Sequence, residues 1–187
     1  MDSGVAQLES MLGTPYKPVE SIAVSSCRWV DSEARLGLEF PSDYKALIET
    51  FGSHAWGGFI NTLTPAHANR HLELEARGLR ILGSIHEVRH ECPGIIPYPV
   101  YPESCGLFPW AVTDNGDYLC WLTLGYANWW PTVVIEARGG AVEKHAMTAT
   151  ALIASFLEGS LKSPVLVGPF GGRLPREADP GWEDGCY

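Results

Sequence analysis

The chain has 187 residues, of which 45% are hydrophobic and 19% are charged, a balance that predicts one soluble globular domain and disfavours intrinsic disorder. The formal net charge is −9 at pH 7, from 22 acidic and 13 basic residues. This charge disfavours a nucleic-acid partner, because the whole molecule would repel it, and favours a basic partner. It also keeps a protein soluble, and composition alone does not separate these two explanations.

We expect a cytoplasmic protein without membrane association. The segment MDSGVAQLESMLG has neither the basic nor the apolar region of a secretory signal, and no segment approaches the length of a membrane span. The five cysteines are scattered, with no C-x-x-C pair, which favours free thiols in a reducing compartment over a disulfide framework.

Helices are predicted in the first half of the chain at residues 3–12, 31–36, 42–51 and 68–91. The third helix is the clearest, because its apolar residues recur at i, i+3, i+4 and i+7: Tyr44, Leu47, Ile48 and Phe51. Pro41 or Ser42 suits its start, and Gly52 can adopt the left-handed conformation that ends a helix. Between the third and fourth helices, the β-branched and aromatic content of residues 57–63 predicts a short strand.

Strands are predicted after a proline-rich loop at residues 93–102. Two apolar runs flank the sequence Asp114-Asn115-Gly116-Asp117, and Asn-Gly is the pair typical of a type I′ hairpin. The segments PTVVIEA and AVEKHAM repeat this pattern, which predicts at least four consecutive strands in an antiparallel meander.

One more helix is predicted near the end of the chain, with Thr148 before its first turn and TALIASFLEG as its body. The tail 164–187 is rich in glycine and proline, so we expect it to be irregular, with at most one short edge strand at residues 165–167. Together the elements predict an α+β fold with a mainly antiparallel sheet flanked by N-terminal, middle and C-terminal helices.

One segment resembles a zinc enzyme. The sequence His86-Glu87-Val88-Arg89-His90 matches H-E-x-x-H, in which two histidines one helical turn apart bind zinc and the glutamate acts as general base. The extended motif requires glycine and histidine where this chain has Pro93 and Ile96, and Glu103 is badly placed as a third ligand. The apolar stripe of the same helix also puts both histidines on its wetter face. We therefore predict no metal site, and a zinc hydrolase remains an alternative that metal analysis would decide.

Other catalytic patterns are missing from the sequence. It has no G-x-S-x-G elbow, no P-loop and no dinucleotide-binding glycine pattern. Asp114 and Asp117 could be imagined as a general acid and base, but aspartates that flank an Asn-Gly turn are first of all turn residues. We therefore predict a protein that is not an enzyme and that needs no cofactor.

The order of these segments resembles the SUKH superfamily, the group of bacterial immunity proteins related to fungal cell-wall synthesis regulators. The likeness covers residues 28–161 of a single domain that we assign to residues 1–187. Its best markers are the helix entry Phe40-Pro41-Ser42-Asp43-Tyr44 and the pair Gly116-Asp117 followed by Trp121, with Phe40 standing where the family usually has leucine. The resemblance implies an α+β fold and a binding function. Bacterial members neutralise a polymorphic toxin, and fungal members act as intracellular regulatory scaffolds.

From the resemblance, the charge and the missing catalytic set, we expect an immunity protein that occludes a basic toxin domain, such as a nuclease. The alternative is a regulatory scaffold with an endogenous partner. Aromatic residues in loops are the first candidates for contact, because tryptophan and tyrosine concentrate binding energy at interfaces. We predict five binding residues: Trp56, Asp114, Asp117, Trp129 and Trp130. Adjacent Trp129 and Trp130 cannot both face inward if they lie on a strand.

Overall fold

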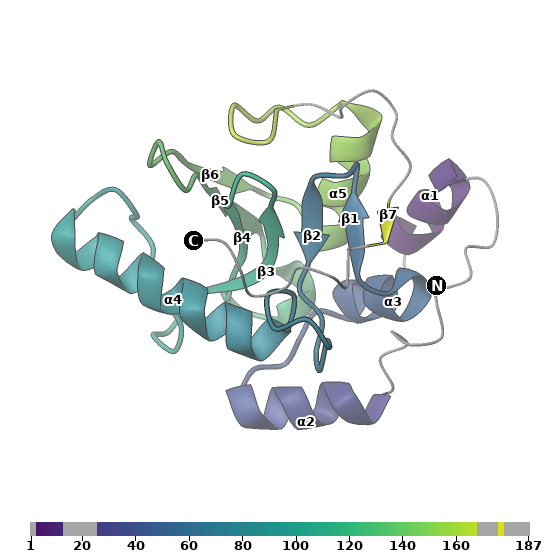
Figure 1. Ribbon diagram of the computed structural model, residues 1–187, viewed down its shortest axis with the longest axis horizontal. Helices are drawn as coiled ribbons and strands as arrows, with labels where there is room; N and C mark the ends of the chain where they lie inside the picture. Colours follow the sequence, from purple (N-terminus) through teal and green to yellow (C-terminus); the bar gives the residue numbers. More distant parts are fainter. Residues whose placement is uncertain (1–2, 13–25, 168–175, 178–187) are drawn as a thin grey trace.

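The computed structural model describes residues 3–12, 26–167 and 176–177. Among these residues, the strands form one seven-stranded sheet in the order β6-β5-β4-β3-β2-β1-β7, and every neighbouring pair is antiparallel (Figure 1). The strands are β1 (His54–Trp56), β2 (Ile60–Thr62), β3 (Leu107–Thr113), β4 (Tyr118–Leu122), β5 (Thr132–Ile135), β6 (Val142–His145) and β7 (Arg176–Glu177). The expected antiparallel meander is confirmed in β3 to β6.

Helices cover the sheet on both faces. They are α1 (Ser3–Leu12), α2 (Ser26–Leu36), α3 (Ser42–Phe51), α4 (Leu74–Glu91) and α5 (Ala149–Glu158). Helices α1, α3 and α5 pack on one another, whereas α4 crosses β3 (Figure 1). Successive side chains of a strand point to opposite faces, so Trp121 of β4 faces α3 while Tyr118 and Cys120 face α4. The predicted α+β class is therefore confirmed.

An aromatic cluster fills the layer between α3 and the sheet. The ring of Tyr44 on α3 meets that of Trp121 edge-on, with a centroid distance of 4.8 Å, and also contacts Trp110. The Tyr44 hydroxyl donates to the backbone oxygens of Leu63 and Trp110, the latter at 2.9 Å. Because a buried hydroxyl without a partner is costly, these two bonds hold α3 in register with the sheet.

Helices α3 and α5 are joined by a buried carboxylate. Oδ2 of Asp43 accepts hydrogen bonds from the backbone nitrogen and the hydroxyl of Thr150, at 3.3 and 2.7 Å. Thr148 is the N-cap residue of α5, as predicted, but its own side chain makes no capping bond. Asp43 therefore supplies the negative charge that stabilises the start of α5.

Several predicted boundaries were wrong. Helix α2 begins at Ser26, five residues earlier than expected. Strand β1 was not predicted, and Gly57 and Gly58, which were assigned to the strand at residues 57–63, instead form a turn with φ of 62° and 68° between β1 and β2. Added side chains are poorly tolerated at such positive φ angles, which explains the glycine pair.

The fourth helix also begins later than predicted, at Leu74 instead of about Ala68. Thr64 is the cause, because its nitrogen donates to the oxygen of Leu72 and its oxygen accepts from the nitrogen of Leu74. These bonds hold the residues just before Leu74 beside Thr64, which follows β2, and those residues are therefore not helical. Glu73 then caps the helix by accepting a hydrogen bond from the nitrogen of Ala76 at 2.6 Å.

The hairpin between β3 and β4 is confirmed, but its turn is not type I′. A type I′ turn requires positive φ at both central residues, and only Gly116 has it, with φ of 89°. The nitrogen of Gly116 donates to the oxygen of Thr113, and the nitrogen of Thr113 donates to the oxygen of Asp117. The loop is therefore the three-residue kind, in which glycine takes the last position.

The end of the chain departs from expectation as well. Residues 164–166 form bends instead of an edge strand, and Val165 and Leu166 are buried. The short strand β7 pairs with β1 in its place. Residues 14–24, where two prolines and the lack of a helical or strand period predict a connector, lie outside the described residues. Within the described residues, no helix is both long enough and apolar enough to cross a membrane.

Candidate functional site

The five predicted contact residues occupy very different environments. Trp56 is fully buried against Phe51, and Trp130 and Asp117 are also buried. Only Asp114 and Trp129 are exposed, and the side chain of Trp129 is 83% accessible. Direct contact with a partner in this conformation is therefore open to Asp114 and Trp129, and the three buried residues support the fold instead.

The two aspartates of the β3–β4 turn already have partners within the fold. Asp117 accepts hydrogen bonds from the Thr113 hydroxyl at 2.7 Å and from the Ala137 nitrogen at 3.0 Å. Asp114 accepts one from the side-chain amide of Asn61 at 2.8 Å. This arrangement ties the turn to β2 and to the loop after β5. It is the arrangement of turn residues and not of a general acid and base.

The loop between β4 and β5, residues 124–130, is the most exposed apolar feature of the described structure, and we call it the aromatic loop. Tyr126 is 87% accessible and Trp129 is 83% accessible, and Leu124 is also exposed. A short 3₁₀ helix, η2 (Ala127–Trp129), forms its centre. Isolated apolar side chains on a surface are ordinary, but adjoining large ones indicate an interaction site.

Hydrogen bonds and packing hold the aromatic loop in place. The buried ring of Trp130 lies 6.1 Å from that of Trp121, and its indole nitrogen donates to the oxygen of Gly125 at 3.2 Å. The Asn128 side chain accepts a hydrogen bond from the nitrogen of Ser42, at the start of α3, at 2.7 Å. The loop is therefore anchored to the core on one side and to α3 on the other, so its exposed rings stand on a fixed backbone.

The charged side chains near the aromatic loop include two ion pairs. Lys45 on α3 is paired with Glu33, and Arg89 is paired with Glu103, which lies three residues before Gly106, the residue that bonds Thr123 just ahead of the loop. Glu39, three residues before Ser42, is exposed and forms no ion pair with the described residues. Lys144 on β6, which lies opposite Val133, is also exposed and also has no ion pair with the described residues.

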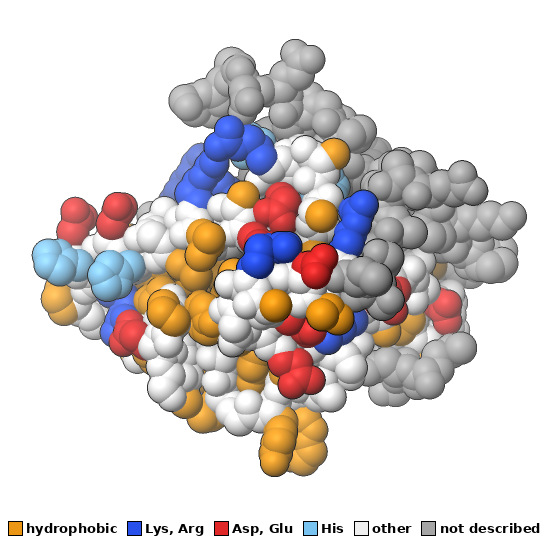
Figure 2. Space-filling model, turned by 90° about the horizontal axis from the view of Figure 1, so that it is seen from below, with side chains coloured by type: hydrophobic (Ala, Val, Ile, Leu, Met, Phe, Trp, Pro, Cys, Tyr) orange, Lys and Arg blue, Asp and Glu red, His pale blue; other side chains and the backbone are white. Residues whose placement is uncertain are grey.

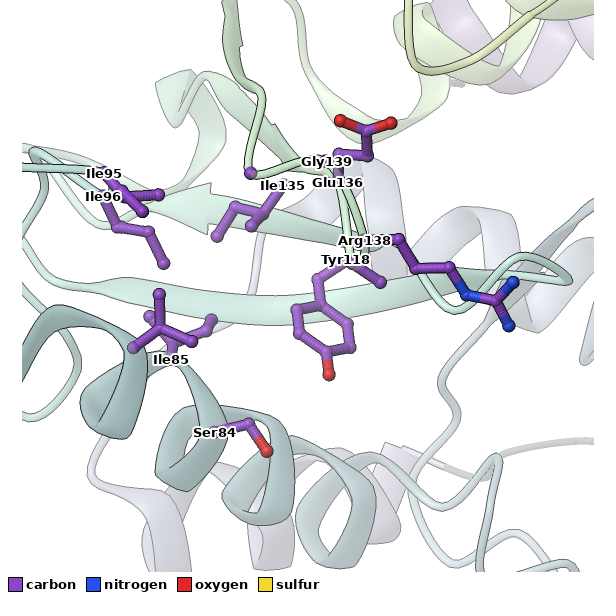
Figure 3. Close-up of a pocket in the computed structure, with 12 residues that line it drawn as sticks. Ser84, Ile85, Ile95, Ile96, Tyr118, Ile135, Glu136, Arg138 and Gly139 are labelled. Atoms are coloured by element: carbon purple, nitrogen blue, oxygen red, sulfur yellow. The ribbon is translucent and has the colours of Figure 1, made fainter. Parts of the chain in front are cut away.

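A hollow lies at the end of β4 opposite the aromatic loop, between the C-terminal half of α4 and the β5–β6 turn (Figure 3). Its volume is about 320 Å³, and the isoleucine side chains Ile85, Ile95, Ile96 and Ile135 converge in it. The charged ends of Glu136 and Arg138 point away from them (Figure 3). The hollow therefore suits an aliphatic group.

The H-E-x-x-H segment lies on the outer side of α4. His86, Glu87 and His90 are all exposed. Figure 2 shows histidine and acidic side chains on the surface at the end of the molecule where α4 ends. Within the described part of the chain, no group of three or more histidine, cysteine, aspartate or glutamate side chains is placed to hold a metal ion. A catalytic zinc needs three protein ligands, and the described residues of this face do not supply such a set.

His54 and Cys120 are buried groups with strongly shifted pKa values, but neither lies in an open site. Burial lowers the pKa of His54 on β1 to about 4, and burial raises the pKa of the Cys120 thiol well above its ordinary value. Both groups are therefore neutral at pH 7. Cys120 is a free thiol in the core. Cys105, which is partly exposed, and Cys92, which is exposed, are free thiols as well.

Sequence reasoning identified Trp129 but missed its neighbour Tyr126. The available signal was the segment LGYANWWP, because a loop between two predicted strands usually carries small and polar turn residues. Here it carries Leu124, Tyr126 and two tryptophans. The structure brings Trp129 and Tyr126 together on one loop, and it separates both from Asp114, which lies at the other end of β4.

Comparison with known proteins supports one family assignment. The family model SUKH_6, described as SMI1-KNR4 cell-wall, matches residues 28–153. This range coincides at its start with the likeness identified over residues 28–161 and includes α3, α4 and the four strands of the meander. Neither the search of curated proteins nor the search of solved structures found a significant match.

Proposed function

The chain belongs to the SUKH superfamily, through the family described as SMI1-KNR4 cell-wall, and from this premise we propose that it is a non-catalytic immunity protein that binds and neutralises a cognate toxin. The family is generally non-catalytic. The partner in this proposal is a toxin domain with a basic surface, such as a nuclease.

The aromatic loop is the observation that carries the proposal. Tyrosine and tryptophan are enriched among the residues that dominate binding energy at protein interfaces. Tyr126 and Trp129 expose nearly all of their side chains, although burial of such rings would stabilise the fold. The anchored backbone reduces the entropy lost on binding, which favours affinity. We therefore expect a binding partner to cover this rigid, exposed aromatic surface.

Charge supports a basic partner. The formal net charge of −9 would attract such a partner over a distance and raise the rate of association. The association rate constant is then expected to fall as salt rises, while the dissociation rate constant changes less. An opposite or absent salt dependence would contradict this part of the proposal.

The experiment that tests the function uses the product of a neighbouring toxin-like gene. We expect the two proteins to form a stable complex and the chain to protect cells that express the toxin. A toxin of another class serves as the control, against which the chain should give neither binding nor protection. No complex and no protection with the neighbouring toxin would defeat the proposal.

A regulatory scaffold is the second candidate, and the description of the matched family as cell-wall favours it. A scaffold would use the same aromatic loop on an endogenous partner. Genomic position separates the two: a gene beside a large secreted toxin supports immunity, whereas an isolated gene supports the scaffold.

A further inference from the structure

We propose that the aromatic loop recognises an arginine side chain of its partner, which stacks on the exposed rings of Tyr126 and Trp129. The inference rests on the proposed function, because it specifies the contact chemistry of the partner at the same site. It adds that the partner is held locally by a cation on aromatic rings as well as by overall charge.

The geometry of the loop presents both rings together. The nitrogen of Trp129 donates to the oxygen of Tyr126 at 3.0 Å, which closes one 3₁₀ turn. Tyr126 is the N-cap residue of η2 and Trp129 is its last residue, so the two lie within one turn of each other. The two side chains are 87% and 83% accessible, so the faces of both rings are open to a partner. A planar group can therefore stack on either ring.

The electrostatics of this region favour a cation. The faces of aromatic rings are negative, and a cation within about 6 Å of a ring centroid is attracted to them. The residues of the loop carry no charge, and the nearby cations Lys45 and Arg89 are already paired with glutamates. Glu39 lies three residues before Ser42, which is bonded to the loop, and three residues of chain span at most about 10 Å. Lys45 and Arg89 are therefore already occupied, and the exposed carboxylate of Glu39 belongs to a segment that is bonded to the loop.

Arginine fits this surface better than the other candidates. Its guanidinium group is planar and weakly hydrated, so it stacks on aromatic faces, whereas the ammonium group of lysine is a compact and strongly hydrated charge. An aliphatic side chain would find more contact in the hollow formed by Ile85, Ile95, Ile96 and Ile135. The rings of Tyr126 and Trp129 therefore suit the guanidinium group of an arginine side chain.

The test uses the full chain with Trp182→Phe, because this substitution removes the one tryptophan outside the described residues. Of the tryptophans in the described structure, Trp129 is the exposed one, so it reports selectively on the loop. The probe is an acetylated and amidated peptide of alternating glycine and arginine. Two matched peptides replace arginine with lysine or with citrulline, which keeps the planar shape of arginine without its charge.

We expect the arginine peptide to shift the emission of Trp129 and to protect it from acrylamide quenching. Calorimetric titration should show that Y126S/W129S weakens binding of this peptide by about five- to thirtyfold. These substitutions do not change net charge, so a purely long-range attraction would leave the affinity unaltered. The control Leu79→Ser removes another exposed apolar side chain, on α4, that is 57% accessible, and it should bind like the parent.

Equal binding of the arginine peptide by Y126S/W129S and by the parent would overturn the inference, and so would equal binding of the citrulline peptide. Weaker binding of the lysine peptide would support it. A toxin that binds Y126S/W129S as tightly as it binds the parent would also overturn it while leaving the proposed function intact. Failure of every toxin to bind, with loop-dependent peptide binding retained, would instead defeat the function alone.

Discussion

The two ends of strand β4 differ in how they use their side chains. At one end, the carboxylate of Asp117 is buried and accepts two hydrogen bonds from the fold. At the other end, Tyr126 and Trp129 leave their rings in solvent while the backbone beneath them is firmly held. A buried polar group whose hydrogen bonds are all made within the fold indicates a structural role. A large apolar side chain that the fold leaves in solvent indicates binding.

The largest expected effect is a difference in the free energy of unfolding between alanine variants of the neighbours Trp130 and Trp129. Trp130→Ala should lower the free energy of unfolding by about 4 kcal/mol, because it removes a buried ring packed on Trp121. Trp129→Ala should change it by less than about 0.5 kcal/mol, because that ring is exposed. Urea denaturation of the two variants measures both values, and similar losses would contradict the assignment of one ring to the core and the other to the surface.

His54 on β1 is another buried polar group, but its protonation opposes folding. Its pKa is lowered to about 4 by burial, so the unfolded state binds the proton more readily than the native state between pH 4 and 6.5. The free energy of unfolding should therefore fall by up to about 3 kcal/mol as pH drops through this window. Denaturation of the parent and of His54→Gln at several pH values measures the difference. Identical pH profiles would show that His54 does not titrate in this way.

A smaller effect distinguishes the two aspartates of the β3–β4 turn. Asp117→Ala should cost about 2 kcal/mol, since it leaves the Thr113 hydroxyl and the Ala137 nitrogen without their acceptor. Asp114→Ala loses one exposed hydrogen bond to Asn61 and should cost less than about 0.5 kcal/mol. Thermal denaturation of both variants provides the test. A larger loss for Asp114 would reverse the roles of the two residues.

The smallest effect is expected at the H-E-x-x-H segment. The double substitution H86A/H90A should change the free energy of unfolding by less than about 0.5 kcal/mol, because both side chains are exposed. Added zinc should leave the melting temperature of the parent and the variant equal. A rise in the parent alone would mean that these histidines bind metal in the native state.

Local patterns predicted most of the fold, whereas contacts between distant segments set the features that were missed. Helix α3 was predicted because its apolar residues repeat at helical spacing, and the β3–β4 hairpin because Asn115-Gly116 favours a turn. The start of α4 depends on bonds between Thr64 and the segment around Leu72, which no local pattern reveals. A strand as short as β1 has too few residues to show alternation.

The site was predicted only in part, for the same reason. Sequence reasoning showed that Trp129 and Trp130 could not both face inward on a strand, but it could not choose between them. The buried residue is Trp130, because its ring packs against that of Trp121 on β4, a contact between distant segments of the chain. Trp56 was named as a contact residue because aromatic residues in loops are candidates for contact, yet the packing of Phe51 against it places it in the core.

The most direct test of the central claim is the affinity of the cognate toxin for Y126S/W129S, measured by calorimetry beside the parent and Leu79→Ser. Removal of two exposed rings at an interface should weaken the complex by at least about tenfold, while Leu79→Ser and the parent should bind alike. If the double variant binds the toxin as tightly as the parent does, the aromatic loop is not the contact surface.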